Sequence, residues 1–353
     1  MTAKIPVSVL GATGTVGQKF IRLLADHPWF EVAAVAASSA SAGRLYGEVV
    51  RWRENAALPE RIARLPVEPC EPPLQGPIVF SALDADVAAP IEQAFARSGA
   101  YVVTNTRIHR MDEDVPLLIP EANSDHLSLI DRQREARGWS GAIIANPNCS
   151  TAALTLALAP LHQAFEIERL FVSTMQAVSG AGYPGVASLD IVGNVIPHIG
   201  GEEEKIERES RKILGTLADG RVKPAEFAVS VHTNRVAVVD GHLEAVSVGF
   251  RRRVTPDEAI STLQEFRSPP CVAELPSSPM PPIEVDLRLD RPQPRLDLDR
   301  GRGMAVTVGR VRPCPVLDLR LVILGHNTIR GAAGQAVQIA ELLVADGRVE
   351  RPK

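Results

Sequence analysis

The chain has no closely spaced cysteines. Its four cysteines, at positions 70, 149, 271 and 314, are far apart in the sequence and form no CxxC pair. Zinc sites and disulfide frameworks use closely spaced cysteines, so we expect neither, and we predict no metal site. Isolated thiols are typical of a reducing compartment, which favours a cytoplasmic protein.

Long apolar runs and an excess of positive charge are absent as well. No hydrophobic run reaches the roughly 18 residues of a membrane span. The opening segment MTAKIPVSVL leads directly into a predicted strand and lacks the pattern of a signal-peptide cleavage site. The net charge of −4 argues against a nucleic-acid surface. We therefore expect a small-molecule substrate and no membrane or nucleic-acid partner.

The N-terminal segment has the pattern of a strand–helix–strand unit. Residues 7–10 and 32–36 are predicted strands, and the glycines of GATGTVG at 11–17 lie in the first turn. Gly11 permits a tight turn, Gly14 permits a pyrophosphate to approach the backbone, and Gly17 permits close packing of helix and strand. The spacing is GxxGxxG rather than the commoner GxGxxG, but its position predicts a dinucleotide-binding site.

The segment after the second strand indicates which dinucleotide binds. An NAD site usually has Asp or Glu here to hold the ribose 2′-hydroxyl. The sequence ASSASAGR at 37–44 has neither. The hydroxyls of Ser38, Ser39 and Ser41 and the cation of Arg44 favour the 2′-phosphate of NADP, and an ordinary serine-rich loop is the alternative.

The order of predicted elements indicates an α/β protein with two domains, as its 353 residues allow. Strands alternate with helices up to residue 145, which predicts a doubly wound Rossmann-type parallel sheet. An α+β catalytic and dimerisation domain with a large mixed or antiparallel sheet is expected to follow. We place the NADP-binding domain at residues 1–148, completed by a C-terminal helix at 328–353, and the second domain at 149–327.

Several expectations concern that second domain. Residues 170–178, 228–239, 241–249, 304–311 and 317–324 are predicted strands, those at 228–239 and 241–249 being long and antiparallel. Residues 201–214, 255–266 and 327–343 are predicted helices. The stretch 268–294 has eight prolines and is expected to be an irregular loop or a segment that crosses over the sheet.

The motif NPNCST at 146–151 is the centre of the predicted site. An apolar strand at 142–145 precedes it, and a helical pattern follows. Asn148 is a favourable N-cap residue, so Cys149 is expected at a helix N-terminus. Free N–H groups and the helix dipole favour negative charge there. This position should lower the pKa of Cys149 and make it a nucleophile, whereas a small buried cysteine is the alternative.

A nicotinamide site together with an activated cysteine indicates aldehyde oxidation or its reverse through a thioester. This chemistry needs an acid/base group, for which histidine is suited. His242 is the first choice, and His232, His109 and His198 are its rivals, because sequence spacing places none of them near Cys149. Arg107 and Arg110 could bind an anion. Glu202 and Lys205 share a helix face, as a solvated ion pair would also do.

Five segments resemble one family in order and register. They are GATGTVG at 11–17, NPNCST at 146–151, QAVSGAG at 176–182, RVAVVDGH at 235–242 and HNTIRGAAG at 326–334. As a set they are similar to the aspartate-β-semialdehyde dehydrogenase family, and NVIPHIGGEEEKI and DRPQPRLD point to its archaeal-type branch. The resemblance extends over nearly the whole chain.

The resemblance implies NADPH-dependent conversion of L-4-aspartyl phosphate to L-aspartate 4-semialdehyde, on the route to lysine, methionine and threonine. It implies Cys149 as the nucleophile, His242 as acid/base and Gln176 as an orienting residue. Arg235 would hold the substrate carboxylate and Glu202 the amino group. Arg110 and Lys205 would bind phosphate, with Asn148 beside it or at the oxyanion. The implied NADP-lining residues, together with the glycines above, are Thr13, Gly14, Thr15, Val16, Ser38, Ser41, Ser179, Gly180 and Asn327.

Some alternatives stay open. Relatives often have Arg or Lys where this chain has Ala40, so some NAD use is expected. Malonyl-CoA reductase has the same scaffold and cysteine chemistry, although Glu202 favours a substrate with an amine. A glyceraldehyde-3-phosphate-type dehydrogenase and a non-catalytic nucleotide-binding regulator fit the motifs less well. The resemblance also implies a homodimer or homotetramer formed through the second sheet.

Overall fold

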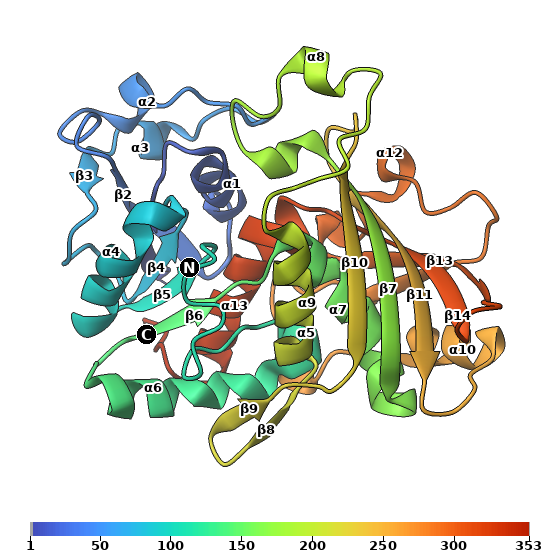
Figure 1. The fold of residues 1–353 in the computed structure, drawn as a ribbon. Coiled ribbons are helices and arrows are strands. Elements are labelled where there is room, and N and C mark those ends of the chain that lie inside the picture. The colour runs from blue at the N-terminus through green and yellow to red at the C-terminus, as the bar shows by residue number, and fades with distance from the viewer. Residues whose placement is uncertain (1–2, 353) are drawn as a thin grey trace.

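The computed structural model describes residues 3–352, and these form two six-stranded sheets, one in each half of the chain, and a small two-stranded sheet (Figure 1). The first sheet is entirely parallel. Its strands are β1 (Ile5–Leu10), β2 (Phe30–Ala37), β3 (Val67–Pro69), β4 (Ile78–Ser81), β5 (Tyr101–Thr104) and β6 (Ala142–Ala145). Their order is β3-β2-β1-β4-β5-β6, so the strand order reverses between β1 and β4. Ligands bind at the carboxyl ends of strands near such a reversal.

Helices cover this sheet on both faces, which confirms the Rossmann-type prediction. Every residue of β4, β5 and β6 is buried, as expected for a parallel sheet between two helical layers. The helices of this half are α1 (Thr15–Leu24), α2 (Tyr46–Val49), α3 (Glu60–Ala63), α4 (Ala85–Arg97), α5 (Pro120–Asn123), η1 (Ser124–Ser128) and α6 (Leu129–Arg137).

The second sheet is mixed, in agreement with the predicted fold class. Its strands are β7 (Ile167–Gln176), β10 (Ala228–Arg235), β11 (His242–Phe250), β12 (Ile283–Asp286), β13 (Val306–Pro313) and β14 (Leu319–Gly325), in the order β10-β7-β11-β14-β13-β12. Strands β10 and β11 run in opposite directions but are not neighbours. Strand β7 lies between them, parallel to β10 and antiparallel to β11. The expectation of an irregular stretch at 268–294 is wrong in part.

That proline-rich stretch contains strand β12 and the short helix α11 (Pro270–Ala273). Strand β12 pairs only with β13, at the edge of the sheet. An edge strand leaves one side without ladder hydrogen bonds, so prolines beside it cost little. Proline content alone therefore did not reveal the strand.

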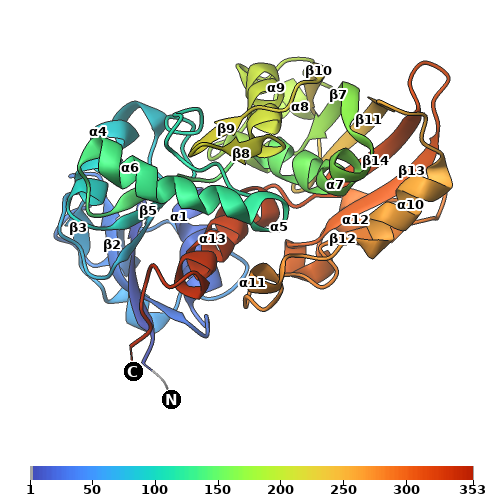
Figure 2. The ribbon, with the colours of Figure 1, turned by 90° about the horizontal axis from the view of Figure 1, so that it is seen from below.

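Helices cover one face of the second sheet (Figure 2). The helices α7 (Cys149–Phe165) and α10 (Pro256–Glu265) contact the strands, and α9 (Glu202–Ile213) packs against β10 and α7. Inner residues of β7 are buried, whereas Phe171 on the other face is 41% exposed. Smaller elements are η2 (Val178–Ala181), α8 (Ser188–Ile191), β8 (Thr216–Ala218), β9 (Arg221–Lys223), α12 (Pro294–Asp297) and η3 (Arg300–Gly303). Among residues 3–352 no helix is long and apolar enough to cross a membrane.

The chain ends beside the first sheet. After the π turn η4 (Ile329–Ala333), helix α13 (Gly334–Ala345) packs into the same apolar core as β1, β4 and β5. The fully buried guanidinium of Arg330 donates two hydrogen bonds to Glu121, of 2.7 and 3.0 Å. This ion pair fixes the last segment to helix α5. The domain boundaries at 148 and 327 stay a prediction.

Removing one partner of this buried pair should destabilise the protein strongly. Glu121→Ala leaves the Arg330 cation buried without its carboxylate, which we expect to lower the free energy of unfolding by about 3–5 kcal/mol. The exposed pair of Glu113 and Arg221 provides the control, since Glu113→Ala should cost at most about 1 kcal/mol. Urea unfolding measures both variants, and equal losses would contradict the expectation.

Candidate active site

Cys149 is the first residue of α7, directly after the segment that leaves β6. The Asn148 side chain accepts hydrogen bonds from the backbone N–H groups of Ser150 and Thr151, at 3.0 and 3.2 Å. This contact confirms the predicted N-cap. The cap orients the first turn, so the Cys149 side chain lies at the junction between the two sheets.

The π turn near the C-terminus packs against the cysteine. A β-carbon added at Gly331 would lie 2.6 Å from Cβ of Cys149 and 2.8 Å from its Cα. Only glycine fits at such a close approach. The environment of Cys149 is therefore made in part by a segment about 180 residues later in the chain.

His242 is the histidine that the fold brings to the cysteine. Its Nε2 lies 3.1 Å from Sγ of Cys149, and its Nδ1 accepts a hydrogen bond from the backbone N–H of Ala177 at 3.1 Å. The rivals lie elsewhere. His109 contacts Asp112, His232 packs against Phe171, and His198 is exposed.

The electrostatic environment differs from the expectation for an isolated helix N-terminus. Burial raises the pKa of the Cys149 thiol, and the carboxylate of Glu202 raises it further, whereas Arg110, Lys205 and Arg235 lower it. Burial also lowers the pKa of His242. The predicted lowering of the Cys149 pKa is wrong for the ligand-free protein, because loss of water around the sulfur outweighs the three cations. Both shifts favour the neutral form, the thiol at Cys149 and the uncharged imidazole at His242.

Helix α9 places charged side chains next to this pair. The Glu202 carboxylate is buried and accepts a hydrogen bond from Asn148 Nδ2 at 2.7 Å, and it forms an ion pair with Lys205. Arg110 also lies beside α9, through a 3.0 Å ion pair with Glu209. Four of the five predicted substrate residues, Arg110, Asn148, Glu202 and Lys205, are thus brought together.

Arg235 and Gln176 end two neighbouring strands. They are paired in register at the ends of β10 and β7, and Nη1 of Arg235 donates to the carbonyl of Ala177 at 2.8 Å. A β-carbon at Gly180 would lie 2.9 Å from Arg235 Nη1 and 3.0 Å from His242 Cε1. Gly180 therefore approaches both side chains closely, and a larger residue would displace them.

The glycine-rich turn can accept a dinucleotide phosphate. Gly11 has φ +68°, and a β-carbon there would lie 2.4 Å from the carbonyl oxygen of Ala82. At Gly17 a β-carbon would lie 2.3 Å from the oxygen of Gly11, so this glycine allows the turn to pack on α1. At Gly14 the nearest atom is 3.3 Å away, and no side chain caps the helix. The free N–H groups of this first turn, in Thr15 and Val16, suit a pyrophosphate.

The other predicted cofactor residues come from separate segments of the chain. Asn327 connects the backbone N–H of Gly241 to the hydroxyl of Ser179, with hydrogen bonds of 2.8 Å each. Ser38, Ser39 and Ser41 follow β2, next to the exposed Arg44. Thr13 lies in the glycine-rich turn, where its carbonyl accepts a hydrogen bond from Gln18. The residues that contact NADP stay a prediction.

Four polar residues at this site were not predicted from the sequence. They are the buried Asn146, Glu209 and Lys212 and the half-buried Asn105. Asn146 Nδ2 donates to Asn105 Oδ1 at 2.6 Å, but Asn105 Nδ2, Asn146 Oδ1 and Arg110 Nε have no partner within the described part of the chain. Buried polar atoms usually have hydrogen-bond partners, so these three fit a polar ligand. Asn105 and Asn146 directly follow β5 and β6. Their position at the carboxyl ends of two parallel strands could have indicated from the sequence that they belong to the site.

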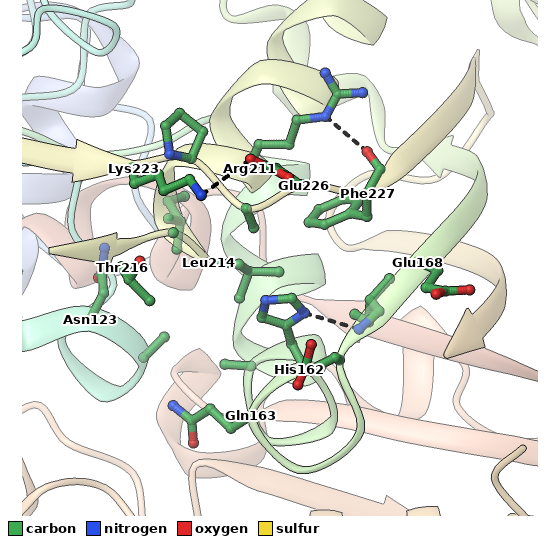
Figure 3. Close-up of a pocket in the computed structure, with 18 of the residues that line it drawn as sticks. Asn123, His162, Gln163, Glu168, Arg211, Leu214, Thr216, Lys223, Glu226 and Phe227 are labelled. Carbon is green, nitrogen blue, oxygen red and sulfur yellow. Dashed lines mark hydrogen bonds and ion pairs between the residues drawn. The ribbon is translucent and has the colours of Figure 1, made fainter. Parts of the chain in front are cut away.

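The cavity of about 1390 Å³ shown in Figure 3 lies away from this site. Asn123, His162, Arg211, Lys223 and Phe227 line it, and His162 is at the opposite end of α7 from Cys149, about 20 Å along the helix. The close-up shows basic side chains, Arg211 and Lys223, and acidic side chains, Glu168 and Glu226, around this cavity. In residues 3–352 no three His, Cys, Asp or Glu side chains are arranged to hold a metal ion.

Comparison with known proteins assigns the family. Residues 6–130 match the family model "Semialdehyde dehydrogenase, NAD binding domain", and residues 158–330 match "Semialdehyde dehydrogenase, dimerisation domain". The chain belongs to the semialdehyde dehydrogenase family. The resemblance found in the sequence is therefore confirmed.

Individual relatives match over almost their full length. An aspartate-semialdehyde dehydrogenase from Methanothermobacter thermautotrophicus is 50% identical, with 96% of this chain and 99% of that protein covered. A crystal structure of the Candida albicans aspartate-semialdehyde dehydrogenase with NADP has a TM-score of 0.91 and 41% identity, covering 98% and 100% of the two chains. A malonyl-CoA reductase (NADP) from Metallosphaera sedula is 38% identical, with 99% and 100% covered.

The raised thiol pKa predicts how Cys149 reacts with iodoacetamide. Only the thiolate reacts, so alkylation of the ligand-free protein should speed up about tenfold per pH unit between pH 7 and 9. Peptide mapping by mass spectrometry separates Cys149 from the exposed Cys271, and Cys149→Ser should remove this signal alone. An alkylation rate that does not change between pH 7 and 9 would mean that the pKa of Cys149 lies below this range and would contradict the expectation.

Proposed function

We propose that this enzyme reduces L-4-aspartyl phosphate with NADPH to L-aspartate 4-semialdehyde and phosphate, a branch-point step toward lysine, methionine and threonine. The observation that carries the proposal is the 3.1 Å contact of Cys149 Sγ with His242 Nε2, next to the carboxylate of Glu202 and the cations of Arg110 and Arg235. An acyl phosphate with an amino group and a carboxylate is complementary to these charges.

The reaction has two stages, formation of a thioester on Cys149 and reduction of that thioester. Cys149 attacks the acyl carbon, the bond to the phosphate oxygen breaks, and the thiol proton leaves with the phosphate. NADPH, when bound, would supply the hydride that reduces the thioester. His242 donates a hydrogen bond through Nε2 to the oxygen that becomes negative, and collapse to the aldehyde returns the thiolate, which takes up a proton from water to restore the thiol. The Arg235 guanidinium holds the substrate carboxylate, Glu202 the amino group, and Arg110 with Lys205 the phosphate.

Malonyl-CoA reduction is the second candidate, because a relative with that name matches the full chain. The buried Glu202 separates the two, since a malonyl group has no amine to pair with this carboxylate. Assays with aspartyl phosphate and malonyl-CoA side by side decide between them. Turnover of malonyl-CoA alone would reject the aspartyl phosphate assignment.

The assembly and the compartment belong to the same proposal. We place a homodimer or homotetramer contact on the face of the second sheet that described helices leave uncovered. A cavity of about 570 Å³ on this face is lined by Phe171, Val316 and other residues, and exposed apolar patches of this kind are typical of interfaces. Free cysteines at 70, 149, 271 and 314 agree with the cytoplasm. Analytical ultracentrifugation measures the number of subunits.

Trapping the thioester tests the nucleophile. L-Aspartate 4-semialdehyde and NADP, without phosphate, should leave an aspartyl group on Cys149 that mass spectrometry locates. Cys149→Ala should lose this adduct and lower kcat by on the order of 10⁴-fold or more. Full turnover in the variant, or an adduct on another residue, would reject the thioester mechanism.

The loop after β2 should set the preference for NADP. Arg44 is exposed next to the serines, so Arg44→Ala should lower the ratio of kcat/KM for NADP over NAD by about tenfold, the worth of one exposed charge on a phosphate. Ala40→Arg should raise the same ratio. The unchanged protein should use NAD measurably, and an NADP preference above about a thousandfold would contradict this.

A further inference from the structure

One face of helix α9 has four charged residues that face the site. Glu202, Lys205, Glu209 and Lys212 are spaced by three, four and three residues, which puts them on the same side of a helix. The first two have proposed substrate roles. Glu209 and Lys212 are only 2% and 5% exposed, and neither has a role in the mechanism above.

Glu209 connects two parts of the site through its two carboxylate oxygens. Oε1 accepts a 3.0 Å hydrogen bond from Nη1 of Arg110, and Oε2 accepts a 2.7 Å hydrogen bond from the backbone N–H of Asn148. Asn148 is the residue immediately before the nucleophile. One buried carboxylate thus fixes both the arginine and the backbone that leads into Cys149.

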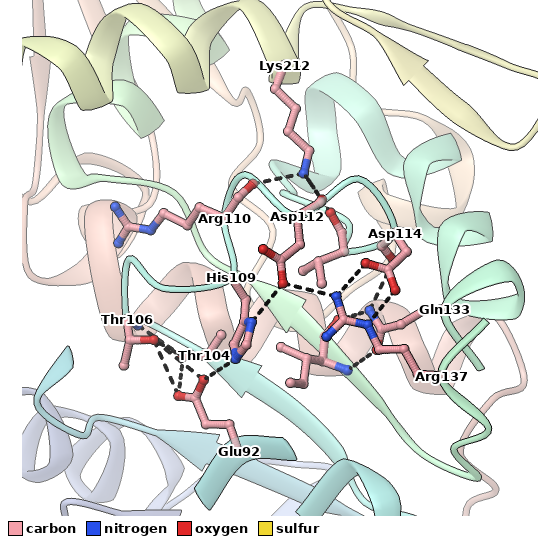
Figure 4. Close-up of polar contacts among 12 residues, drawn as sticks. Glu92, Thr104, Thr106, His109, Arg110, Asp112, Asp114, Gln133, Arg137 and Lys212 are labelled. Carbon is pink, nitrogen blue, oxygen red and sulfur yellow. Dashed lines mark hydrogen bonds and ion pairs between the residues drawn. The ribbon is translucent and has the colours of Figure 1, made fainter. Parts of the chain in front are cut away.

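Lys212 holds the loop that carries the arginine (Figure 4). Its ammonium donates hydrogen bonds to the carbonyls of Arg110, Asp112 and Val115, at 2.8, 2.7 and 2.8 Å. An ammonium has three donors, and all three are used on this loop. The backbone of Arg110 therefore has a fixed position relative to α9.

The guanidinium of Arg110 keeps N–H groups available for a ligand. Nη1 binds Glu209, and Nη2 donates to the carbonyl of Asn105 at 2.8 Å, whereas the buried Nε finds no partner among the described residues. The guanidinium is planar, so fixing two nitrogens also fixes where the third points. The negative charge of Glu209 also offsets the cost of keeping this cation buried.

We propose that Glu209 is a positioning residue for the phosphate step, and that it acts by fixing the Arg110 guanidinium relative to Cys149. This inference rests on the proposed function, because it takes Arg110 as the phosphate-binding residue. In the direction of aldehyde oxidation, a phosphate oxygen attacks the thioester carbon, the C–S bond breaks, and the proton of hydrogen phosphate goes to sulfur. Glu209 serves this step and not the hydride transfer that precedes it.

Rapid-mixing kinetics separate the two steps. Thioester formation from L-aspartate 4-semialdehyde and NADP releases a burst of NADPH, and phosphate is needed only for later turnovers. Glu209→Gln keeps the shape but loses the charge, so the steady-state kcat/KM for phosphate should fall on the order of 10- to 100-fold, as expected for a misplaced binding group. The burst rate should stay within about twofold of that of the unchanged protein.

Three further variants make the test specific. Glu204→Gln changes an exposed carboxylate of the same helix and should alter neither step. Glu209→Asp keeps the charge and should recover part of the phosphate step. Arg110→Lys combined with Glu209→Gln should be little worse than Arg110→Lys alone, because one residue acts through the other.

Other outcomes overturn the inference. A burst and a phosphate step that fall together in Glu209→Gln would show a general structural role, and no change in either would show no role. If the loss in kcat/KM for phosphate in the double variant equals the combined losses of the two single variants, Glu209 does not act through Arg110. Absence of a burst in the unchanged protein would instead reject the proposed function itself, with an NADP binding measurement to show that the protein is folded.

Discussion

The contact between Cys149 Sγ and His242 Nε2 forms only when the two halves of the chain are correctly arranged, and the chemistry of the site depends on it. It joins the first residue of α7, which follows the last strand of the parallel sheet, to the first residue of β11 in the mixed sheet. The sulfur and the imidazole can meet only where the carboxyl ends of one sheet lie against the strand ends of the other. The surroundings of Cys149 are consequently formed by residues from both halves.

Burial disfavours the charged forms of the Cys149 thiol and the His242 imidazole, and the surrounding charges offset this effect only in part. A helix N-terminus favours a thiolate, yet burial and Glu202 outweigh that effect in the ligand-free protein. A substrate that brings an ammonium group to Glu202 would reduce the carboxylate's repulsion of a thiolate. Reactivity therefore depends on what occupies the site as well as on the position of the cysteine in the fold.

Much of this arrangement could be predicted from the sequence because its signals are local. The glycine-rich turn, the Asn148 cap and the alternation of strands and helices need only short segments to be recognised. Helix α9 shows where that approach fails. Glu209 and Lys212 look like solvated charges in a segment rich in Glu and Lys, and only the tertiary contacts with Arg110 and Asn148 bury them. Strand neighbours are equally non-local, so the position of β7 between β10 and β11 was missed.

The π turn against Cys149 has a consequence for how the protein is made. Gly331 packs on the nucleophile, and Arg330 joins the same turn to Glu121 in the first half. Both come from the last part of the 353-residue chain. During translation, the nucleophile would be synthesised long before the segment that completes its surroundings. The surroundings of Cys149 are therefore complete only after the segment at 329–333 has been synthesised and has folded back onto the nucleophile.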